Sequence, residues 1–287
     1  MAAEPCQPGV TARPVRCGAA LSDVEASLLG TRRLRRDGNP SAHPWPDAAQ
    51  WPAIRAYLVS RSVAANPLLD PELTAYSPGE TLWLLERDEV VAWQDEHAVA
   101  LPACYRRVVL VPCAKTKPWT GEAVRRSRLY SAYNTLSQEL DDTCFVTVSE
   151  PLGVVPQHRW GDFLQYDNPG LFKDDAQRSG MTTAQWLASP FGICYAIPFD
   201  AAARAACLVR LGKVLGRFLA ANRDRELYAF VDERNGPPST HALMLDQAVQ
   251  RSGVPVLRHP KRAVARHSPL GAMRSVLCEA DRDRRGR

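Results

Sequence analysis

The chain lacks any closely spaced pair of cysteines. It has eight cysteines, but no CxxC motif and no Cys/His spacing of the kind that holds a structural zinc ion. The sequence therefore predicts neither a metal nor another cofactor. The cysteines stand at positions 6, 17, 104, 113, 144, 194, 207 and 278.

Long apolar runs are also missing. No stretch is apolar over the length that a membrane span needs, and the first residues, MAAEPCQPGVTARP, have neither the basic start nor the apolar core of a secretory signal. We therefore expect a cytoplasmic protein with reduced thiols and no membrane partner.

Charge of one sign is only slightly in excess. Lys and Arg number 36 against 31 Asp and Glu, which gives a net charge of +5. Arginines cluster in residues 32–36 and 282–287, but no aromatic residues are interleaved with them. These clusters suit a nucleic-acid partner, but without interleaved aromatics solvated tails are the favoured interpretation. With 45% hydrophobic residues, the chain can still bury a full-sized core.

The pattern along the chain predicts four parts. Residues 1–48 are rich in Pro, Gly, Ala and Arg, so we expect a flexible or irregular segment. Residues 49–104 form a small accessory α+β region, residues 105–280 an α/β catalytic domain, and residues 281–287 a basic tail. In the accessory region, the pattern predicts a helix over residues 51–63, then two strands joined by the charged turn at 86–89.

Strands and helices alternate in the main domain. This alternation predicts a three-layer α/β/α fold with a mainly parallel sheet, in which ligands bind beyond the carboxyl ends of the strands. Ser239 or Thr240 could cap the last helix. The predicted strands are Val108–Val111, Cys144–Val148, Leu227–Val231 and Val254–Leu257, and the predicted helices are Arg125–Leu140, Ala201–Ala221 and a third that ends near Val249.

Polar segments follow three of these strands, and they should meet in one cleft. The first, PCAKTKPW, places Cys113 beside Lys115 and Lys117, which favour a reactive thiolate, and Trp119 offers a face on which a base could stack. An inert buried cysteine flanked by solvated lysines is the alternative interpretation.

The other two segments add ionisable groups. Ser149 and Glu150 end the second strand, and the Glu150 carboxylate could accept hydrogen bonds from a guanine-like base, although it could equally be an exposed loop residue. Asp232, Glu233 and His241 follow the third strand. They form either part of the binding site or an ion-paired helix start.

Three ordered motifs resemble the catalytic domain of archaeosine synthase. VPCAKTKPW matches its PC-x3-KPY motif, SEPLGVVP matches SPLGVVP, and YDNPGLF matches its YD segment. Trp119 replaces the family's Tyr, Glu122 stands where the family has Ser, and QHRW lacks the acidic residue that usually follows GVVP. The resemblance covers residues 108–172.

The resemblance implies a fold similar to uracil-DNA glycosylase and addition to the nitrile of a 7-cyano-7-deazaguanine base. In such a reaction Cys113 could attack the nitrile carbon, Lys117 could donate to its nitrogen, and Asp167 could relay a proton. Asp167 could instead only cap the turn DNPG. Tyr166 and Asn168, beside Asp167, complete the predicted substrate-binding set.

The predicted function is therefore conversion of that nitrile, in DNA or tRNA, to an amide or amidine. DNA is favoured because the chain lacks the base-exchange and RNA-binding domains of the archaeal relatives, and a transglycosylase that inserts the base is an expected partner. Two alternatives stay open: an enzyme acting on the N-glycosidic bond with an Asp that activates water, and a nucleic-acid-binding protein without catalysis.

Overall fold

The computed structural model describes residues 51–114, 117–120, 128–169, 171, 200–232, 238–260, 271 and 273–277. The chain divides into two units, residues 1–57 and 58–287. Of the first unit, only residues 51–57 belong to the described part. The expectations for residues 1–48 and for the basic tail at 281–287 therefore lie outside the described residues.

A mostly parallel five-stranded sheet forms the centre of the second unit, in the order β3-β2-β1-β4-β5. β1 pairs in parallel with β2 and β4, β4 pairs in parallel with β5, and β3 runs antiparallel to β2. The strands are β1 (Arg107–Pro112), β2 (Thr143–Ser149), β3 (Gly153–Pro156), β4 (Glu226–Asp232) and β5 (Leu257–Pro260).

Alternating residues of β1 belong to two different cores. Val108 and Leu110 pack in one hydrophobic cluster, whereas Val109 and Val111 pack in the other. A strand whose side chains alternate between two buried faces must be apolar throughout, which explains the unbroken run in the sequence. The expected α/β class with a mainly parallel sheet is confirmed.

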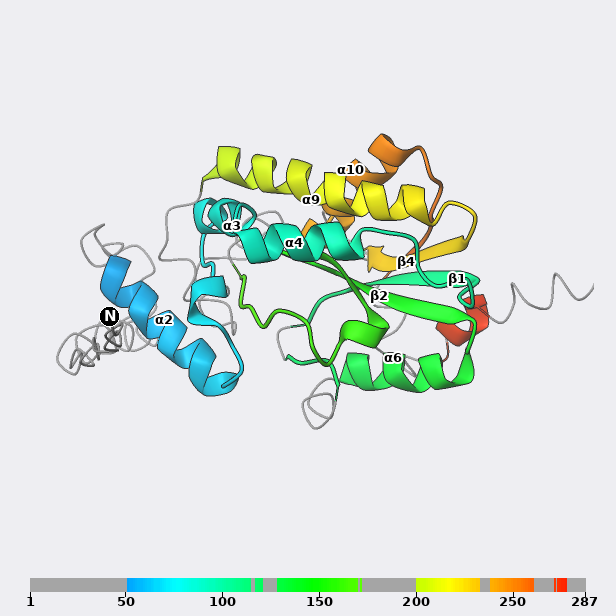
Figure 1. Ribbon diagram of the computed structural model, residues 1–287, viewed down its shortest axis with the longest axis horizontal. Coiled ribbons are helices and arrows are strands. Elements are labelled where there is room, and N and C mark those ends of the chain that lie inside the picture. Colours follow the sequence, from blue (N-terminus) through cyan, green and yellow to red (C-terminus); the bar gives the residue numbers. More distant parts are fainter. Residues whose placement is uncertain are drawn as a thin grey trace, which may run out of the picture. The chain divides into compact units, whose positions relative to one another are not determined.

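Helices cover both faces of this sheet. α9 (Ala201–Ala221) and α10 (Thr240–Ser252) pack against each other and contribute to the first core, and α6 (Arg128–Glu139) contributes to the second. Figure 1 shows α9 and α10 on one side of the strands and α6 on the other. The bounds of α9 agree with the predicted helix, and Ser239 caps α10 by accepting a hydrogen bond from the backbone N–H of Ala242.

The accessory region is helical, so the prediction of two strands at 81–101 is wrong. The segment forms α3 (Pro78–Leu84) and α4 (Asp88–His97), after α2 (Trp51–Ala65) and a short 3-10 helix η2 (Pro71–Leu73). The helix signals were present: Ser77 caps α3 by accepting from the Glu80 N–H, Pro78 occupies the first turn, and Glu80 bonds back to the Tyr76 N–H. The short apolar runs LWLL and VVAW favoured strands, and the prediction followed these runs and not the capping residues.

β3 is a strand where the sequence predicted only a loop. It follows β2 after the short turn 150–152, and the 3-10 helix η3 (Gln157–Arg159) comes next. Gly153 has a φ of 77°, and a Cβ there would lie 2.6 Å from Val214 Cγ1 of α9. Only glycine fits this turn, because both the backbone conformation and the space exclude a side chain.

β5 lies further along the chain than predicted: the expected strand was Val254–Leu257, and the observed one is Leu257–Pro260. In the part of the chain that the structure describes, no helix combines the length and the apolarity needed to cross a bilayer.

Candidate active site

Cys113 leaves the end of β1 on a backbone that β2 holds in place. Its N–H donates to the carbonyl of Val148 at 3.1 Å, which extends the parallel pairing by one residue. The side chain is partly buried. Because the neighbouring strand fixes the backbone, the sulfur has a defined position at the carboxyl edge of the sheet.

Glu150 follows β2 and is 1% exposed. Its Oε2 lies 3.8 Å from Cys113 Sγ and 3.5 Å from His241 Nε2. Its other oxygen, Oε1, is buried without a hydrogen-bond partner among the described residues. The Glu150 carboxylate thus contacts Cys113 and His241 through Oε2, while Oε1 can still accept a hydrogen bond.

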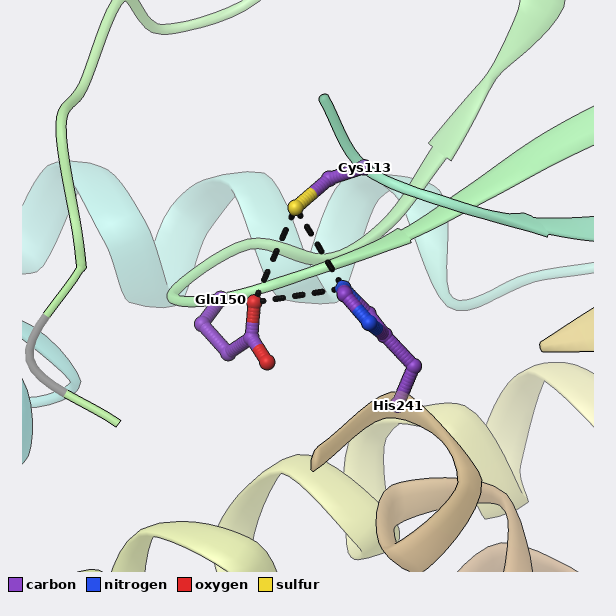
Figure 2. A group of neighbouring side chains, drawn as sticks. All are labelled: Cys113, Glu150 and His241. Carbon is purple, nitrogen blue, oxygen red and sulfur yellow. Dashed lines mark hydrogen bonds and ion pairs between the residues drawn. The ribbon is translucent and has the colours of Figure 1, made fainter. Parts of the chain in front are cut away.

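His241 completes the group from the first turn of α10. Ser239 positions this turn, because its hydroxyl donates to the carbonyl of Val231 in β4 and also caps the helix. His241 Nε2 then lies 3.3 Å from Cys113 Sγ. Figure 2 shows the three side chains pointing toward one another from three separate segments.

The electrostatics of this group favour a charged histidine. Burial opposes the imidazolium, but the Glu150 carboxylate and Cys113 outweigh burial and raise the pKa of His241 to about 10. Burial also opposes the Glu150 carboxylate, yet His241 and Lys117 together lower its pKa. A cationic imidazole 3.3 Å from the sulfur stabilises negative charge on that atom.

Lys117 brings a second cation to the site. The residue is 9% exposed, and its Nζ lies 4.4 Å from the centre of the Tyr166 ring. Tyr166 is itself buried, and burial, with smaller contributions from Cys113 and Glu150, raises the pKa of its phenol. The Tyr166 hydroxyl has no hydrogen-bond partner among the described residues. Lys117 and Tyr166 therefore belong to the same site as Cys113.

The segment Tyr166–Asn168 is extended, so successive side chains point to opposite sides. The Asp167 side chain therefore points away from those of Tyr166 and Asn168. Asp167 pairs through its backbone with Leu73 and Ala75, and its carboxylate accepts a 2.5 Å hydrogen bond from the Ser62 hydroxyl of α2. Tyr166 and Asn168 project from the other side of this segment. Asp167 thus holds α2 and η2 against the domain, and the structure does not bring its carboxylate to Cys113.

Asn168 is buried and held by Thr81 of α3. The Thr81 hydroxyl lies 2.8 Å from Asn168 Oδ1, and Asn168 Nδ2 has no partner among the described residues. Thr81 also contacts the carbonyl of Ser77. Since a hydroxyl carries one hydrogen, either assignment of the amide leaves one of its polar atoms unsatisfied. Ser149, buried at the end of β2, likewise has an unpaired hydroxyl.

Trp119 has no exposed surface, which differs from its expected role. Its ring stacks on Tyr130 and Phe163 with centroid distances of 4.9 and 4.5 Å and meets Trp160 edge-on. A base therefore cannot stack on Trp119 unless these rings move. Trp119 instead anchors the loop after Cys113, because its Nε1 donates to the carbonyl of Ala114.

Asp232 ends β4 but is paired away from the cysteine. Arg258 of β5 donates to both of its carboxylate oxygens and also pairs with Asp246 of α10. The Asp232 side chain is 26% exposed. Asp232 is thus ion-paired, as in the alternative interpretation of an ion-paired helix start, but its partner is Arg258 of β5. Lys115 and Glu233, the remaining predicted site residues, lie outside the described part of the chain.

Two positioning residues were not predicted from the sequence. Thr81 and Ser62 hold Asn168 and Asp167 from more than eighty residues away in the chain. Ordinary hydroxyl residues in helices give no sequence signal of such a role. The expectation of no metal also rested on local spacing, whereas Cys113, Glu150 and His241 form a group whose ligand atoms all lie within 4.8 Å of one another.

Comparison with known proteins adds no identification: no family model, no curated protein and no solved structure matches this chain. The function is therefore inferred from the geometry of the site and from the motifs that it brings together.

Proposed function

We propose that this protein is a nucleic-acid-modifying enzyme that converts the nitrile of a 7-cyano-7-deazaguanine base to an amide or amidine, on a fold similar to uracil-DNA glycosylase. One observation carries the proposal. The three segments that hold the motifs resembling archaeosine synthase contribute Cys113 and Lys117, Glu150, and Tyr166 to a single site; Glu150 lies just before the matched residues 152–156 of its segment. Such convergence is expected of motifs that serve one reaction.

The arrangement suits covalent addition to a nitrile. The Cys113 sulfur forms a bond to the nitrile carbon while one π pair of the C≡N bond moves to nitrogen, which takes a proton from Lys117 or His241. The product of this step is a thioimidate. Water or ammonia then adds to the same carbon, one of its protons moves to the nitrogen, and another returns to the residue, Lys117 or His241, that donated in the first step. The C–S bond breaks, and the thiolate departs to leave an amide or an amidine. Two cations beside the reacting atoms stabilise the charge that develops on nitrogen and sulfur.

The unsatisfied polar atoms supply a recognition set for a guanine-like edge. Glu150 Oε1 can accept from the amino and imino groups of the base, and the Ser149 hydroxyl, the Tyr166 hydroxyl and the Asn168 amide can pair with its remaining polar atoms. A ligand that satisfies buried donors and acceptors recovers the free energy that their burial costs. A base within a duplex would reach this site by flipping out of the stack.

DNA is the favoured substrate over tRNA, and the base would be supplied by a transglycosylase partner that inserts it. The glycosidic-bond alternative needs a carboxylate that activates water. The two aspartates that the sequence offered are engaged elsewhere, Asp167 with Ser62 and Asp232 with Arg258. The geometry therefore favours nitrile addition.

The test uses the purified full chain and a synthetic DNA duplex carrying one 7-cyano-7-deazaguanine. Mass spectrometry of the digested nucleosides should show a product heavier than the substrate by one water or one ammonia molecule. Intact-protein mass spectrometry should show a transient adduct on the enzyme. Cys113→Ala should lose both, whereas Cys104→Ala, which removes an exposed cysteine outside the site, should retain both.

If the protein released the free base, and if Cys113→Ala retained this activity, the proposal would be overturned in favour of an enzyme that acts on the glycosidic bond. Tight, salt-sensitive DNA binding without any product would favour the non-catalytic alternative. Parallel assays on tRNA carrying the same base decide between the two polymers.

A further inference from the structure

The three side chains of Cys113, Glu150 and His241 do not form a linear relay. In a relay, the nucleophile contacts one ring nitrogen of the histidine and the carboxylate contacts the other. Here the sulfur and the Glu150 Oε2 both approach Nε2, at 3.3 and 3.5 Å, and they lie 3.8 Å from each other. Three potential ligand atoms therefore surround one point in space, as Figure 2 shows.

These separations resemble the edges of a metal coordination tetrahedron. With zinc bonds of about 2.3 Å to sulfur, about 2.0 Å to nitrogen and about 2.1 Å to oxygen, tetrahedral ligands lie roughly 3.4 to 3.6 Å apart. The observed distances of 3.3, 3.5 and 3.8 Å depart from that range by a few tenths of an ångström. Shifts of a few tenths of an ångström would match the three atoms to such a tetrahedron.

The ligand types select the class of ion. A thiolate and an imidazole favour Zn²⁺ and its neighbours over Mg²⁺ and Ca²⁺, which prefer sites made wholly of oxygen. The thiolate and the carboxylate together balance the two charges of the ion. Three residues that bind through one atom each leave the fourth position to water or to the second Glu150 oxygen, and Cys113 is the partly exposed member of the group.

A second observation points to a ligand at the same place. Glu150 is 1% exposed and its Oε1 has no partner among the described residues. A buried carboxylate with an unsatisfied oxygen is costly unless something binds there. Bidentate coordination of an ion through both oxygens would satisfy Oε1, which would then occupy the fourth coordination position.

We propose that Cys113, Glu150 and His241 form a three-ligand site for a Zn²⁺-class ion, and that the bound ion inhibits the enzyme by withdrawing the Cys113 sulfur from reaction. Binding goes beyond the proposed function and does not depend on it. Inhibition rests on the proposed function, because it requires Cys113 to be the nucleophile. The two parts are therefore measured separately.

Binding is tested on the full chain, prepared free of metal under reducing conditions, with Co²⁺ and Zn²⁺ as probes. Co²⁺ should give a thiolate charge-transfer band and the visible bands of a tetrahedral ion at one equivalent, and Zn²⁺ should displace it. Cys113→Ser should lose the charge-transfer band. His241→Gln and Glu150→Gln should each weaken binding by more than about 100-fold, because each removes a direct ligand, a larger change than the loss of an outer partner.

Cys104→Ser is the matched control and should bind as the wild type does, since Cys104 is exposed and outside the group. Circular dichroism on every variant establishes that it is folded. As a second readout, Zn²⁺ should protect Cys113 from alkylation, measured by peptide mass spectrometry, while Cys104 stays reactive. This protection still tests the site if a ligand variant does not fold.

Absence of one-equivalent binding in the wild type, or an unchanged charge-transfer band in Cys113→Ser, would overturn the site. For the inhibitory role, chelator-treated enzyme should form product. Product formation should slow as Zn²⁺ is added and should resume when a chelator removes the ion. Higher turnover with Zn²⁺ would overturn inhibition. Binding without any product under either condition would contradict the proposed function and the inhibition that rests on it, and would leave the metal site established.

Discussion

Two charged clusters lie at the carboxyl ends of parallel strands in the same sheet, and they differ in how fully their charges are paired. Asp232, Arg258 and Asp246 lie at the surface, where every carboxylate contacts the guanidinium. Glu150 and His241 are almost wholly buried, and one oxygen of Glu150 stays unsatisfied. In the sequence, Glu150 and Asp232 each follow a strand, and His241 was grouped with Asp232, so local reasoning did not separate these two clusters.

Unpaired buried charge distinguishes a candidate functional cluster from a structural one. In a surface cluster whose charges are all paired with one another, few polar atoms remain to bind a ligand. Such a cluster also contributes only modestly to stability. A buried cluster with unpaired atoms costs stability unless a ligand or a reaction uses it. The predictions below test this contrast, in order of decreasing effect.

The largest effect should come from removing the buried charge. Glu150→Gln should lower kcat/KM for the nitrile substrate by about 10²–10⁴-fold, because it removes the partner that keeps His241 charged and an acceptor for the base. Asp232→Asn, which alters the surface cluster by the same chemical change, should alter kcat/KM by less than about tenfold, since Arg258 keeps Asp246. Equal losses in the two variants, with both folded, would remove the distinction between the clusters.

A second prediction concerns the buried cation. Lys117→Met should slow turnover by about 10²–10³-fold with little change in substrate affinity, because the lysine stabilises charge that develops only during the reaction. Lys213→Met, which removes an exposed lysine of α9, is the control. A change confined to KM would show that Lys117 only binds substrate.

The pH dependence of stability separates the clusters further. Folding raises the pKa of His241 to about 10, against roughly 6.5 when unfolded. Its contribution is therefore complete below about pH 6.5 and disappears as the pH rises through its folded pKa. The lowered pKa of Glu150 gives a contribution that is present above about pH 4.3 and disappears as the pH falls through its folded pKa.

Denaturant unfolding across pH measures this linkage. The loss of unfolding free energy in His241→Gln relative to the wild type should be greatest between about pH 5 and 6.5 and should shrink toward pH 10. His158→Gln, which changes an exposed histidine of η3, should not show that profile. A pH-independent loss in His241→Gln would mean that packing, and not the ion pair, explains its effect.

The smallest expected effect on turnover concerns Asp167, which the sequence placed among the catalytic residues. Asp167→Ala and Ser62→Ala should each lower the unfolding free energy by about 1–3 kcal/mol, because each breaks the hydrogen bond between α2 and the segment at 166–168. Turnover should fall by less than about tenfold in both. If Asp167→Ala alone abolished turnover, Asp167 would be a catalytic base after all.

The sequence determined the local elements of this protein. The apolar runs of β1, β2 and β4 and the long apolar stripe of α9 are visible in the residues themselves, because strand and helix periodicity depend on near neighbours. The same reasoning placed Cys113, Glu150 and His241 beside strand ends, where parallel sheets bind ligands. In α3 and α4 two local patterns predicted different structures. The short apolar runs favoured strands, whereas the capping residues of α3 correctly indicated a helix.

Only the tertiary structure decided which of these residues meet. Cys113 and His241 are 128 residues apart and approach within 3.3 Å because the pairing of β1 with β4 and the Ser239 cap bring the start of α10 to the end of β1. Asp167 faces Ser62 because its segment pairs with Leu73–Ala75. Which segments pair, and therefore which side chains meet, depends on contacts between parts of the chain that are far apart in sequence, so local periodicity alone does not specify it.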